Sequence, residues 1–255
     1  MRPQAAFSAQ AATAQHAVLS SALSSALPTV TFPGDPGAPD GVFPNNVFAT
    51  AAGVLVVGRM RHAVRRREAA RSDIRGFFAD VLRYRVHDLS AQPHPCELTG
   101  SLVIDRARGL GFCGLSERCD AEGAALMHAA FGLRATLVFD LAPGEYHANV
   151  VLAVLAARAA VVCPAGFADA AVPAAIAALY APHALLLDAR AQAAFAGNVI
   201  ALSPEVVWMS DTVAAALGAG DHAALRAAGF APRSVPLDAI EAAGGSLRCC
   251  VGEIY

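Results

Sequence analysis

Three residues whose side chains could together carry out nucleophilic chemistry lie far apart in this sequence: Cys249, His147 and Glu97. In such a set a thiolate attacks an electrophilic carbon, an imidazole moves protons, and a carboxylate orients and charge-stabilises the imidazole. A free thiol is only a few per cent ionised near neutrality, so a cationic group, either His147 or a bound ligand, must favour the thiolate. We therefore predict these three residues as a catalytic triad.

The elements that must position the triad are short. Residues 246–255 read as a short apolar strand that carries the thiol. Because neighbouring side chains on a strand point to opposite faces, Arg248 and Cys250 should face away from Cys249. His147 and Glu97 each lie beside another strand-like run.

Composition limits the class of protein. The 255 residues are 56% apolar, which is enough to bury a large core, and we assign residues 1–255 to a single domain. A net charge of −2 provides no global field for nucleic acid or an anionic membrane. No apolar run approaches the roughly 20 residues that a spanning helix needs, and no compact signal-peptide core follows Arg2. We expect a cytoplasmic protein that binds neither membranes nor nucleic acid.

The cysteines and histidines do not form a metal motif. No CxxC pair occurs, and the eight histidines are scattered without zinc-like spacing. We therefore predict no metal and no cofactor. Most of the cysteines should be small core residues, as free cysteines usually are; they are Cys96, Cys113, Cys119, Cys163, Cys249 and Cys250.

The pattern along the chain predicts an α/β protein built from repeated modules. Two strands, a helix and a further strand recur at intervals of about fifty residues, which favours a radial array over a doubly wound sheet. The turn-rich stretch 33–41 should be a loop. The expected strands are 53–57, 101–105, 110–115, 135–140, 149–155, 159–163 and 184–187, and the expected helices are 1–25, 64–82, 121–131 and 168–180.

The helix expected at 64–82 carries a basic cluster. Arg65, Arg66, Arg67 and Arg71 lie opposite its apolar residues. The cluster could bind an anion, but we favour a solvated helix face that Glu68 and Asp73 partly balance.

Six short motifs occur in the order seen in the guanidino-group-modifying superfamily. They are Phe43-Pro44-Asn45-Asn46, Glu97-Leu98-Thr99-Gly100-Ser101, Leu115-Ser116-Glu117-Arg118, Tyr146-His147-Ala148-Asn149, Phe195-Ala196-Gly197-Asn198 and Gly245-Ser246-Leu247-Arg248-Cys249. Within that superfamily the chain most resembles the amidinotransferase-like, arginine-deiminase-related hydrolases that include citrulline ureidases.

The resemblance implies a pentein fold, a five-bladed α/β propeller of ββαβ modules. It also implies that Cys249 attacks the central carbon of a guanidino or ureido group to give a covalent intermediate that water hydrolyses. His147 would protonate the departing nitrogen and later activate the water, and Glu97 would orient the imidazole. The expected activity is citrulline hydrolysis to ornithine, carbon dioxide and ammonia.

The substrate expectation depends on neutral amides. Relatives that act on arginine typically grip its guanidinium with acidic residues, whereas the matching positions here hold Asn46 and Asn149. Amides offer both donor and acceptor, which suits a ureido group. We predict that Asn46, Asn149 and Asn45 bind the substrate and that Arg118 clamps its carboxylate, although Arg118 could instead form an ion pair with Asp120 or Glu117. Asn198 could order a loop around the pocket.

Several alternatives stay open at this point. The substrate could be arginine or a methylated arginine, the reaction could be amidino transfer, or the chain could be a non-catalytic pentein that only binds. Close relatives usually have methionine after the catalytic cysteine, so Cys250 leaves some choice between two thiols. Relatives place an apolar strand before the Arg-Pro pair, whereas Met1 directly precedes Arg2-Pro3 here, so the first blade could lack a strand or the true chain could start earlier. The partner is expected to be a small amino acid of the citrulline or arginine type, and an oligomer is possible.

Overall fold

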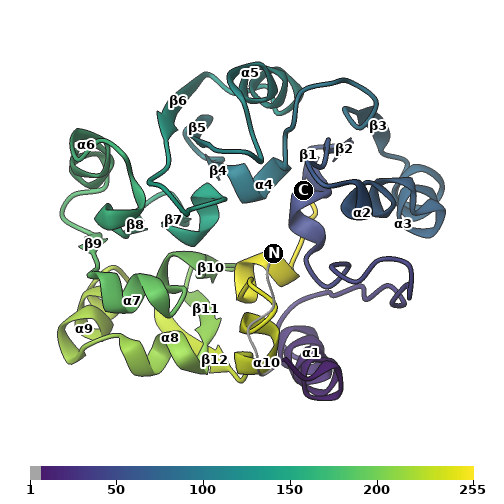
Figure 1. Ribbon diagram of the computed structural model, residues 1–255. Coiled ribbons are helices and arrows are strands. Elements are labelled where there is room, and N and C mark those ends of the chain that lie inside the picture. The colour runs from purple at the N-terminus through teal and green to yellow at the C-terminus, as the bar shows by residue number, and fades with distance from the viewer. Residues whose placement is uncertain (1–6) are drawn as a thin grey trace. The chain divides into compact units, whose positions relative to one another are not determined.

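The computed structural model describes residues 7–255, in which the strands group into four three-stranded sheets (Figure 1). Each sheet pairs two antiparallel strands and adds a third strand parallel to the second. The sheets are β1 (Phe48–Ala51), β2 (Val54–Val57) and β3 (Arg85–Asp88); β4 (Leu102–Asp105), β5 (Leu110–Leu115) and β6 (Ala135–Asp140); β7 (Leu152–Leu155), β8 (Ala159–Val162) and β9 (Ala184–Leu186); and β10 (Ile200–Ala201), β11 (Val206–Ser210) and β12 (Ala231–Val235). The first strands begin at residues 48, 102, 152 and 200, so the predicted α/β modules and their spacing are confirmed.

Helices connect the second strand of each module to the third. A parallel pair cannot be closed by a tight hairpin, so a crossover is required. Asp120 starts one crossover helix by accepting a hydrogen bond from the Gly123 N–H at 2.7 Å, and Ser210 starts another by accepting from the Val213 N–H at 3.1 Å. The helices are α2 (Ala63–Arg66) and α3 (Ser72–Gly76) in the first module, α5 (Ala121–Ala130) in the second, α6 (Ala171–Leu179) in the third, and α8 (Asp211–Ala216) and α9 (Ala219–Ala227) in the fourth, where α7 (Ala189–Ala193) precedes the sheet.

A short helical turn precedes the first strand of every module. These turns are η1 (Pro44–Asn46), α4 (Leu98–Ser101), η4 (Ala148–Val150) and η6 (Ala196–Asn198), and a fifth, η7 (Leu247–Cys250), lies near the end of the described chain. The strand predicted around Cys249 is therefore wrong, because short apolar runs do not distinguish a strand from a helical turn. In a 3₁₀ turn consecutive side chains are separated by about 120°, so Arg248 and Cys250 still diverge from Cys249 but are not opposite to it.

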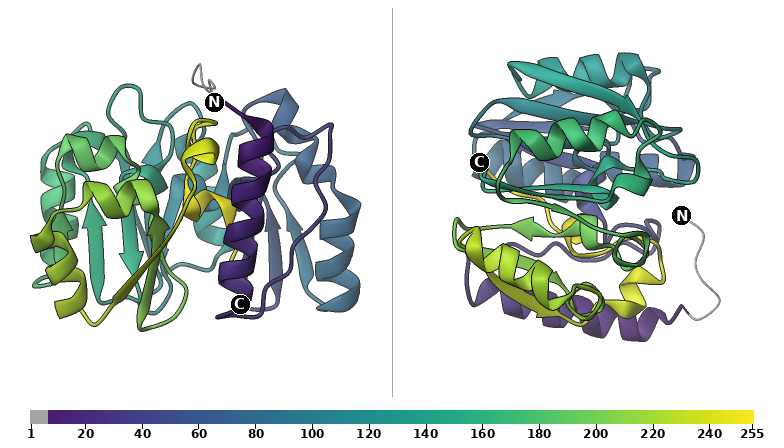
Figure 2. Two further views of the ribbon diagram at one scale, coloured as in Figure 1. Left: turned by 90° about the horizontal axis from the view of Figure 1, so that it is seen from below. Right: turned by 90° about the vertical axis from the view of Figure 1, so that its left-hand side faces the viewer.

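A fifth module is not visible as a sheet in the described residues. Segments 7–47 and 236–255 hold α1 (Ala9–Ser24), η1, α10 (Asp238–Glu241) and η7, and no strand. Gln15 of α1 donates to the Asp238 carboxylate at 2.6 Å, and the long helix α1 is seen along its length in Figure 2. The predicted missing strand before Arg2-Pro3 lies outside the described residues, and closure into a five-bladed propeller stays a prediction.

The continuous helix predicted over 64–82 is wrong. The segment divides into α2, η2 (Glu68–Ala70), α3 and η3 (Phe77–Val81). Arg65 is buried, because its guanidinium pairs with Glu68 at 2.8 Å and donates to the Phe43 carbonyl at 2.8 Å. These tertiary contacts interrupt the helix despite its periodicity. Arg65 therefore does not lie on the solvated face where it was predicted. The predicted balance of Arg71 by Asp73 is confirmed at 2.5 Å.

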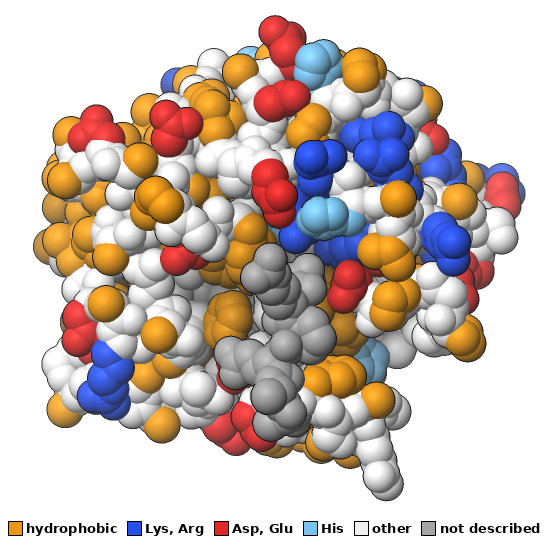
Figure 3. All heavy atoms as spheres, in the orientation of Figure 1, with side chains coloured by type: hydrophobic (Ala, Val, Ile, Leu, Met, Phe, Trp, Pro, Cys, Tyr) orange, Lys and Arg blue, Asp and Glu red, His pale blue; other side chains and the backbone are white. Residues whose placement is uncertain are grey.

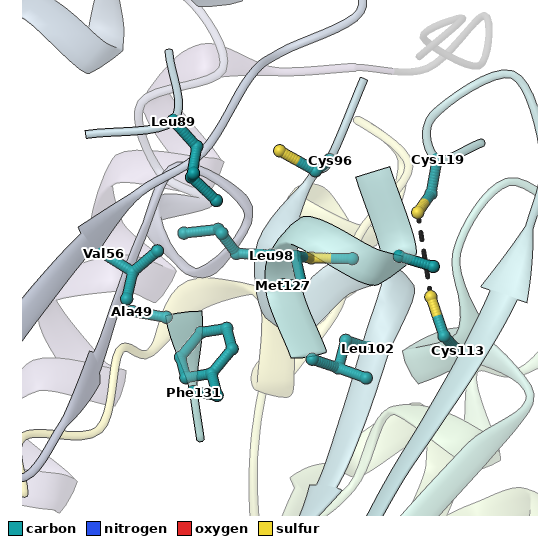
Figure 4. Packing of buried hydrophobic residues seen from close by; sticks show 11 residues of the cluster. Ala49, Val56, Leu89, Cys96, Leu98, Leu102, Cys113, Cys119, Met127 and Phe131 are labelled. Carbon is teal, nitrogen blue, oxygen red and sulfur yellow. Dashed lines mark hydrogen bonds between the residues drawn. The ribbon is translucent and has the colours of Figure 1, made fainter. Parts of the chain in front are cut away.

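A buried cluster underlies the first two modules. Leu98 and Leu102 pack there with Met127 and Phe131 of the α5 region (Figure 4). The sulfurs of Cys113 and Cys119 lie 3.7 Å apart in the same cluster. All six cysteines are buried, as predicted for small core residues.

The described chain divides into two compact units. One comprises residues 7–31, 150–165 and 173–248, and the other comprises 32–149, 166–172 and 249–255. Every residue of the predicted triad and substrate set lies in the second unit. The single-domain assignment stays a prediction. In residues 7–255 no helix is both long and apolar enough to cross a membrane.

Candidate active site

The predicted base and carboxylate meet directly. Glu97 immediately precedes α4, His147 immediately precedes η4, and the His147 Nε2 lies 2.8 Å from the Glu97 Oε2. Both side chains are about 1% exposed or less. Glu97 also accepts hydrogen bonds from the Arg61 N–H at 3.0 Å and from Arg118 Nη1 at 3.3 and 3.4 Å. The carboxylate is therefore saturated with donors.

The protonation states follow from this environment. Burial by itself raises the pKa of Glu97, but the hydrogen bond and charge of His147, the charge of Arg118 and the Arg61 N–H together lower it to about 2. Burial lowers the pKa of His147, and the hydrogen bond to Glu97 opposes this effect. Because a carboxylate can only accept, Nε2 of the neutral imidazole carries the proton and Nδ1 offers a lone pair. Nδ1 has no hydrogen-bond partner in the described part of the chain, so this atom is available to take up a proton.

The predicted nucleophile lies beside Asn149. The Cys249 thiol is buried, with its Sγ 3.8 Å from Nδ2 and 4.0 Å from Oδ1 of Asn149. The amide can donate to a thiolate or accept from a thiol. Tyr146 lies near the same thiol: burial raises the Tyr146 pKa, and negative charge on Cys249 raises it further. The Tyr146 ring meets the His147 ring edge-on at 4.9 Å. Segment 146–149 therefore places the Asn149 amide beside the thiol and Tyr146 near both the thiol and the His147 ring.

The predicted asparagines of η1, Asn45 and Asn46, are buried and have side-chain polar atoms without a hydrogen-bond partner among the described residues. Oδ1 and Nδ2 of Asn45 and Oδ1 of Asn46 have no hydrogen-bond partner among residues 7–255. A Cβ on Gly100 would lie 2.5 Å from Asn46 Oδ1 and 2.9 Å from Nδ1 and Cε1 of His147. Asn46 and His147 thus converge on the backbone of Gly100, which leaves no space for a side chain.

Arg118 is presented by a tight turn. Its Nη1 reaches Glu97, and its Nε donates to Glu117 at 3.1 Å. The alternative predicted for Arg118, an ion pair with Glu117, is therefore present, whereas Asp120 instead caps α5 and meets His94 at 3.0 Å. The Arg118 side chain is only 4% exposed and joins the buried carboxylate of Glu97 to the exposed carboxylate of Glu117.

Basic side chains gather on the surface over the α2 region of the same unit (Figure 3). The exposed arginines of that segment are Arg61, Arg66 and Arg67. Arg66 is occupied by the carbonyls of Met60 and Arg61 at 3.0 and 3.1 Å. This surface is a solvated basic face, as predicted for Arg66 and Arg67 of the cluster.

In the described segments no group of three or more histidine, cysteine or acidic side chains is arranged to hold a metal ion.

Three contributors to the site were missed from the sequence. Gly100 lies in one of the six motifs, but only its lack of space beside Asn46 and His147 explains it. The backbone N–H of Arg61, which binds Glu97, has no sequence signature. The sequence indicated that Glu68 partly balances the basic cluster, but not that Arg65 and Glu68 form a buried pair.

Comparison with solved structures defines the class of fold. The N-terminal domain of ArgZ, an arginine dihydrolase from the ornithine-ammonia cycle in Cyanobacteria, superposes with a TM-score of 0.83 at 20% identity, covering 96% of this chain and 86% of that one. A dimethylarginine dimethylaminohydrolase variant, as an adduct with S-methyl-L-thiocitrulline, superposes with a TM-score of 0.75 at 19% identity, covering 96% and 89%. The chain has the pentein-type α/β fold of these proteins.

Comparison of sequences defines the family. The family model described as "N,N dimethylarginine dimethylhydrolase, eukaryotic" matches residues 4–255. The N(G),N(G)-dimethylarginine dimethylaminohydrolase of Mycobacterium tuberculosis (strain ATCC 25618 / H37Rv) is 31% identical over 219 residues, which are 86% of this chain and 67% of that protein.

The chain is a hydrolase of carbon–nitrogen bonds, and it belongs to the N,N-dimethylarginine dimethylhydrolase family. The predicted superfamily is confirmed. The matching family corresponds to the alternative activity, hydrolysis of a methylated arginine, and not to citrulline hydrolysis.

Proposed function

We propose that this protein hydrolyses a methylated arginine to citrulline and a methylamine, with Cys249 as the nucleophile. The observation that carries the proposal is the buried His147–Glu97 pair at 2.8 Å, in which the other ring nitrogen, Nδ1, has no hydrogen-bond partner among the described residues. Family membership supports a substituted guanidino group as the target. The buried thiol beside Asn149 supplies the nucleophile.

The reaction would proceed in two halves. The Cys249 thiol gives its proton to Nδ1 of His147, and the thiolate attacks the guanidino carbon. His147 then protonates the departing methylamine, the C–N bond breaks, and an S-linked amidine stays on Cys249. In the second half His147 takes a proton from water, the hydroxide attacks the amidine carbon, and the C–S bond breaks to release citrulline and the thiol. Glu97 stabilises the imidazolium form that appears in each half.

The charge that favours the thiolate would come from the substrate. Burial lowers the pKa of His147, so the resting imidazole is neutral and carries no positive charge. A cationic guanidinium brought next to the thiol supplies that charge instead. Thiol reactivity is therefore expected to rise when a cationic ligand binds.

Arg118 is proposed to clamp the carboxylate of the amino acid. Its bonds to Glu97 are 3.3 and 3.4 Å, longer than the usual charge-assisted distance of about 2.8 Å. A guanidinium held this loosely retains donors for a second carboxylate, which it can bind bidentately. Asn45, Asn46 and Asn149 are proposed to contact the reacting group.

A second candidate function, hydrolysis of a ureido group such as that of citrulline, is favoured by one observation. Asn45 has both an unsatisfied donor and an unsatisfied acceptor, and Asn46 has an unsatisfied acceptor, within the described residues. A guanidinium only donates, whereas a ureido group also offers a carbonyl acceptor. The amides beside the site are neutral, so a neutral ligand leaves no charge uncompensated there.

Product analysis separates the candidates. The wild type and Cys249→Ala would be incubated in parallel with dimethylarginine, arginine and citrulline, and the amines and amino acids identified by mass spectrometry. Dimethylamine and citrulline from dimethylarginine, absent with the variant, support the main proposal. Ornithine from citrulline alone would move the assignment to the ureido activity.

Two further outcomes would overturn hydrolysis itself. Product formed only when an amine acceptor is added would indicate amidino transfer. In that reaction an amine, and not water, attacks the covalent intermediate. No turnover of any substrate would favour a binding role.

A further inference from the structure

The turn that carries Arg118 is anchored at both ends. Ser116 and Cys119 form an isolated antiparallel bridge, with hydrogen bonds of 3.1 and 3.2 Å between their backbones. The Cys119 sulfur packs 3.7 Å from that of Cys113 in the buried cluster of Figure 4. The four-residue turn 116–119 is therefore fixed to the core at Cys119, and Ser116 is the residue at its other end.

The Ser116 side chain makes two hydrogen bonds to residues of the site. Its hydroxyl donates to the Tyr146 carbonyl at 2.7 Å and accepts from the Arg118 N–H at 3.0 Å. The Tyr146 carbonyl belongs to the peptide bond that continues into His147. One hydroxyl thus ties the backbone of the proposed carboxylate clamp to the backbone of the proposed base.

Arg118 and His147 are already linked through their side chains. Both contact Glu97, at 3.3 and 2.8 Å. Ser116 adds a second link through the backbone, so Glu97, Arg118 and His147 are held by a closed set of contacts. A flexible arginine that is held at both its backbone and its guanidinium loses little additional freedom when it binds a ligand.

We propose that Ser116 is a positioning residue that sets the distance between the carboxylate clamp at Arg118 and the base at His147. This proposal rests on the function proposed above. It predicts that loss of the hydroxyl weakens recognition of the carboxylate end of the substrate and slows proton transfer at the other end.

The test uses three variants and two substrates. Ser116→Ala removes both hydrogen bonds, and Ser116→Thr keeps the hydroxyl. Ser203→Ala is the matched control, because the Ser203 Oγ also accepts from turn N–H groups, at 3.2 and 3.3 Å, but lies in the other unit. The substrates are dimethylarginine and its decarboxylated analogue, which lacks the carboxylate that Arg118 is proposed to bind.

Ser116→Ala is expected to raise KM for dimethylarginine about tenfold and to lower kcat about tenfold, as for loss of one hydrogen bond at each end. With the decarboxylated analogue only kcat should fall. Ser116→Thr should restore both values to within about twofold, and Ser203→Ala should match the wild type. An equal KM change for both substrates, or no difference between the alanine and threonine variants, would overturn the proposal.

A second measurement does not depend on turnover. Hydrogen exchange of the peptide containing residues 145–149 should be at least about threefold faster in Ser116→Ala than in the wild type or Ser203→Ala. Unchanged exchange in that peptide would contradict the positioning role. If the wild type turns over neither substrate but exchange behaves as expected, the function proposed above fails while the role of Ser116 in holding the 145–149 segment stands.

Discussion

At the scale of single residues, the central feature is a histidine whose two nitrogens have different surroundings. Nε2 faces the carboxylate of Glu97, and Nδ1 lies against Gly100 and Asn46. The carboxylate stays ionised because Arg118 and the Arg61 N–H also bind it. This arrangement selects one tautomer of the neutral imidazole before any substrate binds.

The buried carboxylate makes stability dependent on pH. The Glu97 pKa is lowered from 4.5 to about 2, so its contribution is complete above pH 4.5 and is lost as the pH falls toward 2. A shift of this size corresponds to about 3 kcal/mol. The pKa of His147 is lowered from 6.5, so the unfolded state takes up a proton more readily than the folded state. His147 therefore also lowers the stability as the pH falls below 6.5. In urea titrations between pH 7 and 2, the wild type should lose stability more steeply below pH 4.5 than Glu97→Gln.

Glu205→Gln, which alters an exposed carboxylate, is the control for that titration. Its curve should run parallel to that of the wild type. If the Glu97→Gln curve is also parallel, Glu97 is not the group that titrates.

A second prediction at this scale concerns Asn46. Replacing it by aspartate adds a negative charge where the acceptor atom Oδ1 is now unsatisfied, so a cationic guanidinium gains a charge-assisted partner. The ratio of kcat/KM for dimethylarginine over citrulline should rise at least about tenfold. The control is Asn46→Ala, which removes the amide without adding a charge and should not raise the ratio. An unchanged ratio in Asn46→Asp would mean that Asn46 does not face the reacting group.

The His147–Glu97 contact could be predicted from the sequence, because the chemistry limits the residue types and because their motifs occur in a fixed order. The catalytic role of Cys249, His147 and Glu97 stays a prediction. The protonation states of the pair could not be predicted. They depend on burial and on donors such as the Arg61 N–H, which comes from a distant segment and from the main chain.

At the scale of elements, the site is assembled from equivalent positions of the repeated modules. Asn46, Asn149 and Cys249 each lie in a short helical turn, and Glu97 and His147 each lie immediately before one. Of the strands that follow these turns, β4 and β7 were predicted from apolar runs and from glycine turns such as Gly109, which has a positive φ between β4 and β5, whereas no strand was predicted at β1 or β10. The turns themselves were not predictable, since three or four residues carry no clear periodicity.

The segment 64–82 shows why periodicity alone failed. Its apolar spacing suits a helix, but Arg65 leaves the solvent to bind Glu68 and the Phe43 carbonyl, just before η1. A buried ion pair holds this segment against the turn that presents Asn45 and Asn46. The sequence contains both partners, but not the fact that they are buried.

This buried pair gives a prediction about stability. Glu68→Gln leaves the Arg65 charge buried without a counter-charge and should lower the free energy of unfolding by about 3–5 kcal/mol. The matched control is Asp73→Asn, which breaks the pair with Arg71, where Asp73 is 44% exposed, and should cost less than about 1 kcal/mol. Urea denaturation at neutral pH measures both. Similar losses in the two variants would contradict the role assigned to burial.

At the scale of the whole molecule, the chain passes repeatedly between its two compact units. Each unit is assembled from three segments that alternate along the sequence. Neither unit is a continuous stretch of chain, so we expect the two to unfold together. Calorimetry should show one transition whose calorimetric and van't Hoff enthalpies agree. Two resolved transitions would contradict the assignment of residues 1–255 to a single domain.

The family could be predicted at the level of the superfamily because six motifs span the chain in order. The particular activity could not be predicted in this way. The substrate expectation depended only on the neutral charge of Asn46 and Asn149, which does not decide the substrate. The family match favours a methylated arginine as substrate. In the proposed mechanism the positive charge of that substrate activates the thiol.

The most direct test of the account is to trap the covalent intermediate. The wild type, Cys249→Ala and Cys250→Ala would be mixed with dimethylarginine and quenched in acid during turnover, and the protein would be analysed by intact mass and peptide mapping. We expect an adduct equal to the substrate minus dimethylamine, on Cys249, in the wild type and in Cys250→Ala but not in Cys249→Ala. An adduct on Cys250, or product formed by Cys249→Ala, would contradict it.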